Sequence, residues 1–394
     1  MFSQEMCKIG KKPSCIRQLF EYGMTVAEKI GKENVYDYSI GNPSVPAPKE
    51  VNEAIVELTK MDSLSVHGYT PAAGDSKTRQ AIAGDITNRT GMTIDAGDIF
   101  ITCGAAPALT SVFTALAVEG AEFIATAPYF PEYQVYVKLS GGKLVIVPAD
   151  TETFQIPLQA LEAAITPHTQ AVIVNSPNNP SGVIYSRETL EKLAGILERK
   201  SQEYGHPIYI VSDEPYRELV YDILEVPFIP TIYPNTIVCY SYSKSLSLPG
   251  DRIGYVCIPA CAADHDDLLP ALAGSARSLG HVCAPAIMQK MLAKCVHLRP
   301  DIRTYDENRQ LLYNELTAMG FHCVKPQGAF YLLMRAPGGD ANAFSEAAKQ
   351  KNLLIVPCDD FGCPGFLRMS TCVAKDMILR SLPAWKELRE EYRQ

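Results

Sequence analysis

The sequence predicts an α/β protein built around a mainly parallel sheet, with a second, smaller α+β domain. Between about residues 98 and 241, short apolar runs alternate with longer stretches of helical character. This alternation is typical of a mainly parallel sheet with helices on both faces. Beyond about residue 285 the pattern changes, because a long helical stretch is followed by short strands and a C-terminal helix.

The predicted strands of the larger domain are short, rich in β-branched residues and bounded by turn formers. Such runs are typical of strands that are buried on both faces of a parallel sheet. They are residues 99–102, 122–127, 144–147, 171–175, 208–213 and 237–242. No G-x-G-x-x-G motif follows any of them, which argues against a dinucleotide-binding Rossmann site.

The two chain ends are predicted to form the smaller domain together. A helical stretch reaches about residue 319, and short strands are expected near 330–334 and 353–356. We therefore expect residues 41–284 to form the larger domain and residues 285–394 the smaller one, with an N-terminal segment, residues 1–40, joining the smaller domain.

Size and charge exclude several classes of protein. A chain of 394 residues is long enough for two domains. Its net charge of −8 argues against nucleic acid or an anionic membrane as the main partner. No apolar window of about 18 residues predicts a membrane span, and the N-terminus lacks the apolar core of a secretion signal. We therefore expect a cytoplasmic protein.

The 12 cysteines predict neither a metal site nor a disulfide framework. They are scattered without a C-x-x-C pair. Cys257 and Cys261 are close in sequence, as are Cys358 and Cys363, but no histidine pair near them completes a zinc pattern. We expect buried small hydrophobic residues or free thiols, and no bound metal.

One lysine lies among hydroxyl groups directly after a predicted strand. In the segment Ser241-Tyr-Ser-Lys244-Ser-Leu-Ser-Leu-Pro-Gly-Asp-Arg252, an arginine follows the lysine by eight residues. An amine that forms a Schiff base needs a partly dry pocket, where enough of it is neutral to attack a carbonyl. Hydroxyls and a guanidinium suit a phosphate dianion. The segment therefore predicts a pyridoxal phosphate site, with a surface lysine after an edge strand as the alternative.

Polar side chains also follow two other predicted strands. Asn175 and Asn179 come at the end of the run 171–174, and Asp213 and Tyr216 follow the run 208–211. An amide, a carboxylate with a phenol, and an amine with an arginine are thus expected at the C-terminal ends of strands. Open α/β sheets bind their ligands at that edge.

These residues, taken together, resemble the class I/II aminotransferase family of fold-type I pyridoxal phosphate enzymes. The resemblance covers essentially the whole chain and is carried by residues in one order: Tyr69, Gly104, Asn179, Asp213, Tyr216, Lys244, Arg252 and Arg368. It implies a large pyridoxal phosphate-binding domain with a mainly parallel seven-stranded sheet, and a small domain made from both chain ends. It also implies transfer of an amino group between an L-amino acid and a 2-oxo acid by a ping-pong mechanism.

The resemblance implies a catalytic role for three residues. Lys244 would form the Schiff base and then move the proton as general acid–base. Asp213 would keep the pyridine nitrogen protonated; the alternative for an aspartate after a strand is a helix N-cap. Tyr216 and Asn179 would donate hydrogen bonds to the phenolic oxygen of the cofactor, with Asn175 supporting the ring.

The cofactor phosphate is expected at the start of a helix. Gly104, Ala105 and Ala106 follow the first predicted strand, where backbone N–H groups favour an anion. Ser241, Ser243 and Arg252 would complete this phosphate site. The family also places an aromatic ring against the pyridine, which selects Phe130, with Tyr129 as the alternative and an ordinary core aromatic as the other explanation.

Three further residues are assigned to the substrate and to a partner chain. Arg368 would bind the substrate α-carboxylate and orient the Cα–H bond. Gly41 would pass beside the substrate together with Asn179. Tyr69 would reach the phosphate of a neighbouring subunit, which implies a homodimer; a surface tyrosine in a Gly/Pro loop is the alternative.

The substrate side chain is not fixed by these motifs. Some aspartate-selective members of the family carry a lysine where this chain has Ala106, and Arg277 and His281 are the other cations in the plausible region. We expect a neutral, aromatic or broad preference, with aspartate still open. A carbon–sulfur lyase is the alternative on the same fold. A regulatory domain that senses the cofactor is more remote, since the family pattern begins by about Gly41 and leaves no room for a DNA-binding domain.

Overall fold

The larger part of the molecule is built on a seven-stranded sheet with helices on both faces. This computed structural model describes residues 1–11, 15–222 and 224–392. The strand order is β2-β8-β7-β6-β5-β3-β4, and β8 runs antiparallel to both of its neighbours. The strands are β2 (Ile99–Thr102), β3 (Glu122–Thr126), β4 (Lys143–Val147), β5 (Thr169–Asn175), β6 (Tyr209–Asp213), β7 (Thr236–Ser241) and β8 (Gly254–Cys257).

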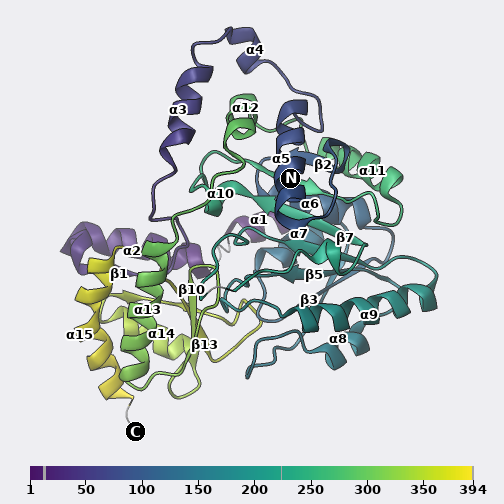
Figure 1. Cartoon of the computed structure of the whole chain (residues 1–394). Coiled ribbons are helices and arrows are strands. Elements are labelled where there is room, and N and C mark those ends of the chain that lie inside the picture. The colour runs from purple at the N-terminus through teal and green to yellow at the C-terminus, as the bar shows by residue number, and fades with distance from the viewer. Residues whose placement is uncertain (12–14, 223, 393–394) are drawn as a thin grey trace.

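Both faces of this sheet are covered, as the apolar runs predict. Along β7, Val238 and Tyr240 pack into one core cluster, whereas Ile237 and Cys239 pack into another on the opposite face. The helices of this part are α3 (Lys49–Leu58), α4 (Ser63–His67), α5 (Ser76–Thr90), α6 (Ala105–Leu116), α7 (Glu132–Leu139), α8 (Leu158–Ala164), α9 (Arg187–Tyr204), α10 (Tyr242–Ser245), α11 (His265–Ser278) and α12 (Ala286–Cys295). Figure 1 shows α3 and α4 standing away from the rest of the molecule.

The smaller part contains a four-stranded antiparallel sheet in the order β12-β13-β10-β9. Its strands are β9 (Cys323–Val324), β10 (Tyr331–Arg335), β12 (Val356–Pro357) and β13 (Phe366–Ser370). The helices α13 (Arg303–Ala318), α14 (Ala341–Lys349) and α15 (Lys375–Glu391) lie beside this sheet (Figure 1). The fold class is therefore confirmed as α/β with a mainly parallel seven-stranded sheet and a smaller antiparallel one.

The N-terminal segment contacts the smaller part. It contains α1 (Gln4–Lys11), α2 (Cys15–Ile30) and β1 (Tyr36–Asp37), and β1 pairs in parallel with β11 (Leu353–Leu354). Helix α12, by contrast, packs its Met291 and Leu292 into the core of the larger part. We therefore propose that the larger domain extends to about residue 296 rather than 284, and the division itself stays a prediction.

Two features are absent from the described part of the chain. Within the described ranges, no helix combines the length and apolar character needed to cross a bilayer. The same residues contain no cluster of three or more His, Cys, Asp or Glu side chains that could hold a metal ion.

Candidate active site

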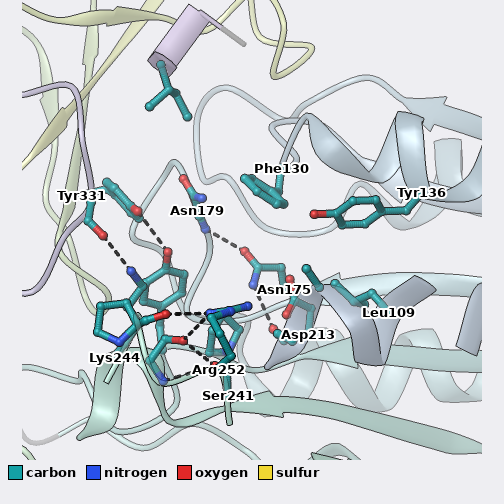
Figure 2. A pocket seen from close by; sticks show the side chains of 18 of the residues that line it. Leu109, Phe130, Tyr136, Asn175, Asn179, Asp213, Ser241, Lys244, Arg252 and Tyr331 are labelled. Atoms are coloured by element: carbon teal, nitrogen blue, oxygen red, sulfur yellow. Dashed lines mark hydrogen bonds between the residues drawn. The ribbon is translucent and has the colours of Figure 1, made fainter. Parts of the chain in front are cut away.

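A cavity of about 290 Å³ lies at the C-terminal ends of β5, β6 and β7. The three strands are parallel neighbours, so that Asn175, Asp213 and the segment after Ser241 arrive at one edge of the sheet. Most of the residues predicted for the site line this cavity: Gly41, Ala105, Ala106, Phe130, Asn175, Asn179, Asp213, Tyr216, Ser241, Ser243, Lys244, Arg252 and Arg368. Figure 2 shows that side chains from both parts of the molecule border it.

Lys244 occupies the short helix α10, directly after β7. Its Nζ donates a hydrogen bond to the carbonyl oxygen of Gly41 at 2.7 Å and lies 5.3 Å from the ring centroid of Phe330. Burial is the main reason that the pKa of the amine is lowered to about 8; Cys372 opposes this shift, and the nearby Arg368 and Arg252 add to it. At pH 7 about a tenth of the amine is therefore uncharged and nucleophilic, far more than for an ordinary lysine.

Asp213 ends β6 as a fully buried carboxylate with one oxygen left without a partner. Oδ2 accepts a hydrogen bond from the hydroxyl of Tyr133 at 2.5 Å, whereas Oδ1 has no partner among the described residues. Burial raises the pKa of Asp213 to about 7; the Tyr133 hydrogen bond lowers it and Glu214 raises it. A buried carboxylate oxygen without a partner fits a site that receives a cationic N–H group.

The residues predicted around the ring are brought together. The backbone N–H of Asn179 donates to Asn175 Oδ1 at 2.7 Å, and Asn175 Nδ2 donates to the carbonyl oxygen of Asp213 at 2.8 Å. The hydroxyl of Tyr216 lies 3.0 Å from that of Tyr331. Figure 2 shows Asn179, Asn175 and Phe130 along the same side of the cavity.

The structure distinguishes Phe130 from Tyr129, the two aromatic residues considered for contact with the pyridine ring. Phe130 lines the cavity, and its ring packs edge-on against Tyr133 with centroids 5.7 Å apart. Tyr129 is buried in a core cluster instead, where its hydroxyl accepts a hydrogen bond from Gln134. The position of Phe130 therefore supports its prediction over that of Tyr129.

The predicted phosphate site contains an arginine without a carboxylate partner. Gly104 precedes α6 with φ 93°, and a Cβ there would come within 2.7 Å of Arg252 Nη2. Arg252 Nη1 donates to Ser243 Oγ at 3.5 Å, and Ser243 Oγ lies 2.7 Å from Ser241 Oγ. No ion pair within residues 1–11, 15–222 and 224–392 involves this arginine. Glycine, hydroxyls, an unpaired guanidinium and a helix start together fit a phosphate.

Arg368 is buried on β13 and also lacks a carboxylate partner among the described residues. Its guanidinium donates to the carbonyl oxygen of Ser39 and lies 4.6 Å from the ring centroid of Tyr331. Nη1 lies 3.4 Å from Asn179 Oδ1, and Nε has no partner among the described residues. A buried guanidinium of this kind fits a carboxylate ligand, because an uncompensated buried charge is costly.

Glycine is required at position 41 because the side chain of Tyr331 leaves no room for a Cβ, and not because the backbone forms a turn there. A Cβ at this position would lie against the hydroxyl of Tyr331 and 2.9 Å from its ring carbon Cζ. Any side chain here would displace Tyr331, and with it the pair of hydroxyls formed with Tyr216. The carbonyl of the same residue receives the hydrogen bond from Lys244.

Besides Gly104 and Tyr129, which are described above, three residues singled out from the sequence do not line the cavity. Tyr69 follows α4 with its side chain 91% exposed. Arg277 is exposed on α11, and His281 instead lies 3.4 Å from Ser111 Oγ beside a separate small cavity.

Several residues in the cavity wall or directly behind it could not be predicted from the sequence. Tyr133 on α7 donates a hydrogen bond to Asp213. Tyr331 on β10 lines the cavity and shares a hydrogen bond with Tyr216. Ile16 from α2 also lines the cavity. The only local signal for Tyr133 is its place three residues after Phe130. Tyr331 and Ile16 come from the smaller part and the N-terminal segment, so no local motif identifies them.

Comparisons with known proteins agree on one family. The pattern of aminotransferase class I and II matches residues 33–382. A crystal structure of an amino transferase from Eubacterium rectale is similar with 53% identity and a TM-score of 0.98, covering 100% of both chains. Aspartate aminotransferase from Thermus thermophilus with maleate is 27% identical with a TM-score of 0.86, covering 98% of this chain and 99% of that one. A probable N-acetyl-LL-diaminopimelate aminotransferase of Bacillus subtilis is 31% identical and covers 89% of this chain and 88% of its own.

Proposed function

The chain belongs to the class I and II aminotransferases, which depend on pyridoxal phosphate, and we propose that it binds this cofactor in the cavity at the ends of β5, β6 and β7. One observation carries the proposal: a lysine of lowered pKa, a buried carboxylate and two arginines line the same cavity. Among the described residues, one oxygen of that carboxylate has no hydrogen-bond partner and neither arginine has a carboxylate partner. Each of these groups fits a different part of pyridoxal phosphate or of an amino acid.

The residues that would hold the cofactor are those whose bonding is incomplete. Asp213 Oδ1 would accept from the pyridine N–H, and Asn179 with Tyr216 would donate to the phenolic oxygen. The phosphate would lie between the start of α6 and Arg252. Phe130 would cover the ring, and Lys244 Nζ would bond to the aldehyde carbon.

Bound pyridoxal phosphate supplies a carbonyl that exchanges an amino group and a ring that takes up electrons from the substrate Cα–H bond. The chain supplies the proton movement and the orientation. Lys244, with its pKa near 8, would take the proton from the substrate Cα and pass it to the carbon that was the cofactor's aldehyde carbon. Arg368 would hold the α-carboxylate, so that the Cα–H bond and not another bond faces the ring.

We propose a substrate with a neutral, apolar or aromatic side chain. Among the described residues that line the cavity, the cations are Lys244, Arg252 and Arg368, and each already has a role. The remaining wall is rich in apolar and aromatic side chains, including Ile16 and Leu109. A distal carboxylate would gain no matching charge from these residues, which disfavours aspartate.

We also propose a homodimer in which Tyr69 completes the partner's phosphate site. Tyr69 follows the projecting α3–α4 arm, is almost fully exposed, and lies outside its own chain's cavity. A phenol in that position is available to a second copy of the chain.

A half-reaction screen tests these proposals. Each amino acid is added to the yellow, cofactor-loaded enzyme, and the loss of its visible absorbance is recorded. We expect rapid bleaching with neutral and aromatic amino acids, slower bleaching with aspartate, and glutamate formation once 2-oxoglutarate is added. Pyruvate and ammonia from cystathionine, without glutamate formation from any amino acid, would instead establish the carbon–sulfur lyase.

A further inference from the structure

A second cavity, of about 430 Å³, lies in the smaller part of the molecule, away from the residues described so far. It is bordered by the turn after α13, by the turn that follows β10 and by the end of α15. The residues that line it are Gly320, Phe321, His322, Arg335, Ala336, Pro337, Gly338, Gly339, Arg389 and Tyr392.

The charged groups of this cavity are all basic. Arg335 and Arg389 line it with the imidazole of His322, and none of the described lining residues is an aspartate or glutamate. The ion pairs found among the described residues involve neither arginine, although most arginines of the chain have an acidic partner. Two guanidinium groups in one cavity without a counter-charge repel each other and favour an anion between them.

Arg389 is held in place and still lacks part of its bonding. Its guanidinium lies 5.7 Å from the ring centroid of Phe321, and Nη1 donates to the carbonyl oxygen of Tyr392 at 2.9 Å. Nε is buried and has no hydrogen-bond partner among the described residues. A buried donor without an acceptor fits an anionic ligand, since such a group is costly to leave unpaired.

Arg335 is positioned by β10 and by an aromatic neighbour. Its guanidinium lies 5.1 Å from the ring centroid of Phe366, and its backbone N–H donates to the carbonyl oxygen of His322 at 2.9 Å. The turn beyond it contains Gly338 and Gly339 with φ of 78° and 81°, a conformation that side-chain-bearing residues rarely adopt. Because a Cβ at Gly339 would meet no atom within 4 Å, the cavity is open at this turn.

We propose that this cavity binds a small organic anion through phosphate or carboxylate groups, with Arg335 and Arg389 as the principal donors. The planar guanidinium fork matches the oxygens of either group. Phe321, Pro337 and Tyr392 supply an apolar wall for the rest of such a ligand. The proposal is independent of the chemistry assigned to Lys244.

The cavity is separate from the candidate active site, but strand β10 contributes a residue to both, and its neighbour β13 carries Arg368. On β10, Tyr331 borders the active site and Arg335 the second cavity, about 13 Å apart at the usual rise per residue. On β13, Phe366 pairs with Arg335 in register, and Arg368 follows two residues later. An anion at Arg335 therefore leaves the substrate site free.

Calorimetric titration of the cofactor-loaded enzyme tests the proposal. Inorganic pyrophosphate and tricarballylate serve as probes that carry only phosphate or only carboxylate groups, and bound cofactor keeps pyrophosphate from the site of Arg252. We expect at least one probe to bind once per chain with a Kd below about 1 mM. Binding of one and not the other identifies the group that the cavity recognises.

Variants connect that binding to the second cavity. Arg335→Gln and Arg389→Gln should each weaken binding at least about tenfold, because each removes a charge-assisted donor. Arg187 is an exposed arginine on α9 that forms an ion pair with Glu191, and Arg187→Gln should leave the Kd unchanged. Arg335 is exposed, so its variant should keep the wild-type Tm even if Arg389→Gln is destabilised. Absence of binding by both probes at 10 times that Kd, or equal binding by Arg335→Gln and wild type, would overturn the proposal.

Discussion

At the scale of single residues, the candidate active site is a set of groups whose charge or hydrogen bonding is incomplete within the chain. Lys244 has no acidic partner among the described residues, Asp213 has one bare oxygen, and Arg368 has a buried Nε without an acceptor. Such arrangements are costly in a folded protein and cluster at functional sites. Their stabilisation is expected from the cofactor and the substrate.

The role of Lys244 predicts a specific loss of chemistry. Lys244→Ala should lower kcat by at least about 10³-fold, because it removes both the covalent attachment point and the proton carrier. Mass spectrometry after borohydride reduction should find the cofactor mass on the peptide that contains residue 244 in wild type only. Lys192→Ala, on the exposed face of α9, is the matched control and should behave as wild type. Normal turnover by Lys244→Ala would refute the assignment.

Asp213 predicts how stability depends on pH in the protein without cofactor. Burial raises its pKa from 3.8 to about 7, so the folded state holds a proton that the unfolded chain releases near pH 4. Between pH 4 and pH 7 the folded state therefore binds more protons than the unfolded chain. The stabilisation that protonated Asp213 contributes is fully present below pH 4 and is lost as the pH rises through 7. Asp213→Asn should remove this loss, which is on the order of 4 kcal/mol of unfolding free energy at pH 8.

The measurement is the Tm of the cofactor-free protein at pH 5 and pH 8. Asp213→Asn should be more stable than wild type at pH 8, with a smaller advantage at pH 5. Asp359→Asn, at an exposed position, should show no such pH-dependent difference. Equal differences at both pH values would contradict the assigned protonation of Asp213.

At the scale of elements, the strand ends explain which site residues the sequence could predict. Apolar runs buried on both faces predict β2 at its observed bounds, Ile99–Thr102, and β6 within one residue. Because neighbouring parallel strands end at the same edge of the sheet, the sequence predicts that Asn175, Asp213 and Lys244 lie near one another, and the structure brings them to one cavity. Strand β8 is not predicted by the apolar runs, because it begins with a glycine and its position is fixed by its antiparallel neighbours β2 and β7.

Contacts between elements could not be predicted in the same way. The hydroxyl pair of Tyr216 and Tyr331 joins the turn after β6 to β10, which lies 115 residues further along the chain. Tyr133 reaches Asp213 from α7, across 80 residues. Local periodicity and motifs carry no information about contacts between residues so far apart in the sequence. The roles of these tyrosines therefore become visible only in the packed structure.

The approach of Gly41 to β10 predicts a substitution with a matched control. Gly41→Ala places a Cβ against Tyr331, which must move and take the Tyr216 hydroxyl pair with it. We expect kcat/KM to fall at least about 100-fold, as for a misplaced positioning group. Gly84→Ala, exposed in helix α5 with no atom within 4 Å of the new Cβ, should keep its activity and gain up to about 1 kcal/mol of stability. Equal activity of the two variants would show that Gly41 tolerates a side chain.

Helix α2 contributes the apolar side chain of Ile16 to the cavity wall, and this contribution predicts a change in substrate specificity. Ile16→Ala should lower kcat/KM for leucine about tenfold, because one or two methylene contacts are lost, and should change the value for alanine little. Ile30→Ala, at the exposed end of the same helix, serves as the control. Equal losses for leucine and alanine would mean that Ile16 does not contact the substrate side chain.

At the scale of the whole molecule, the exposed arm predicts that two chains share each active site. Tyr69→Ala should weaken cofactor binding about tenfold, the value expected for one lost phosphate hydrogen bond. Because Tyr69 is proposed to complete the phosphate site of the neighbouring subunit, a site in a Tyr69→Ala chain can be restored by a partner chain that still carries Tyr69. Chains of Lys244→Ala carry an intact Tyr69, and chains of Tyr69→Ala carry an intact Lys244.

Mixing the two variants under conditions that exchange subunits therefore tests the arrangement directly. In a mixed dimer, the site with Lys244 receives Tyr69 from its partner, so one of the two sites is complete. At limiting cofactor, the mixture should be more active than the same amount of Tyr69→Ala alone. If Tyr69 served its own chain, every site would lack one of the two residues and mixing would restore nothing. Unchanged activity in a mixture whose subunit exchange has been demonstrated would thus exclude the shared site.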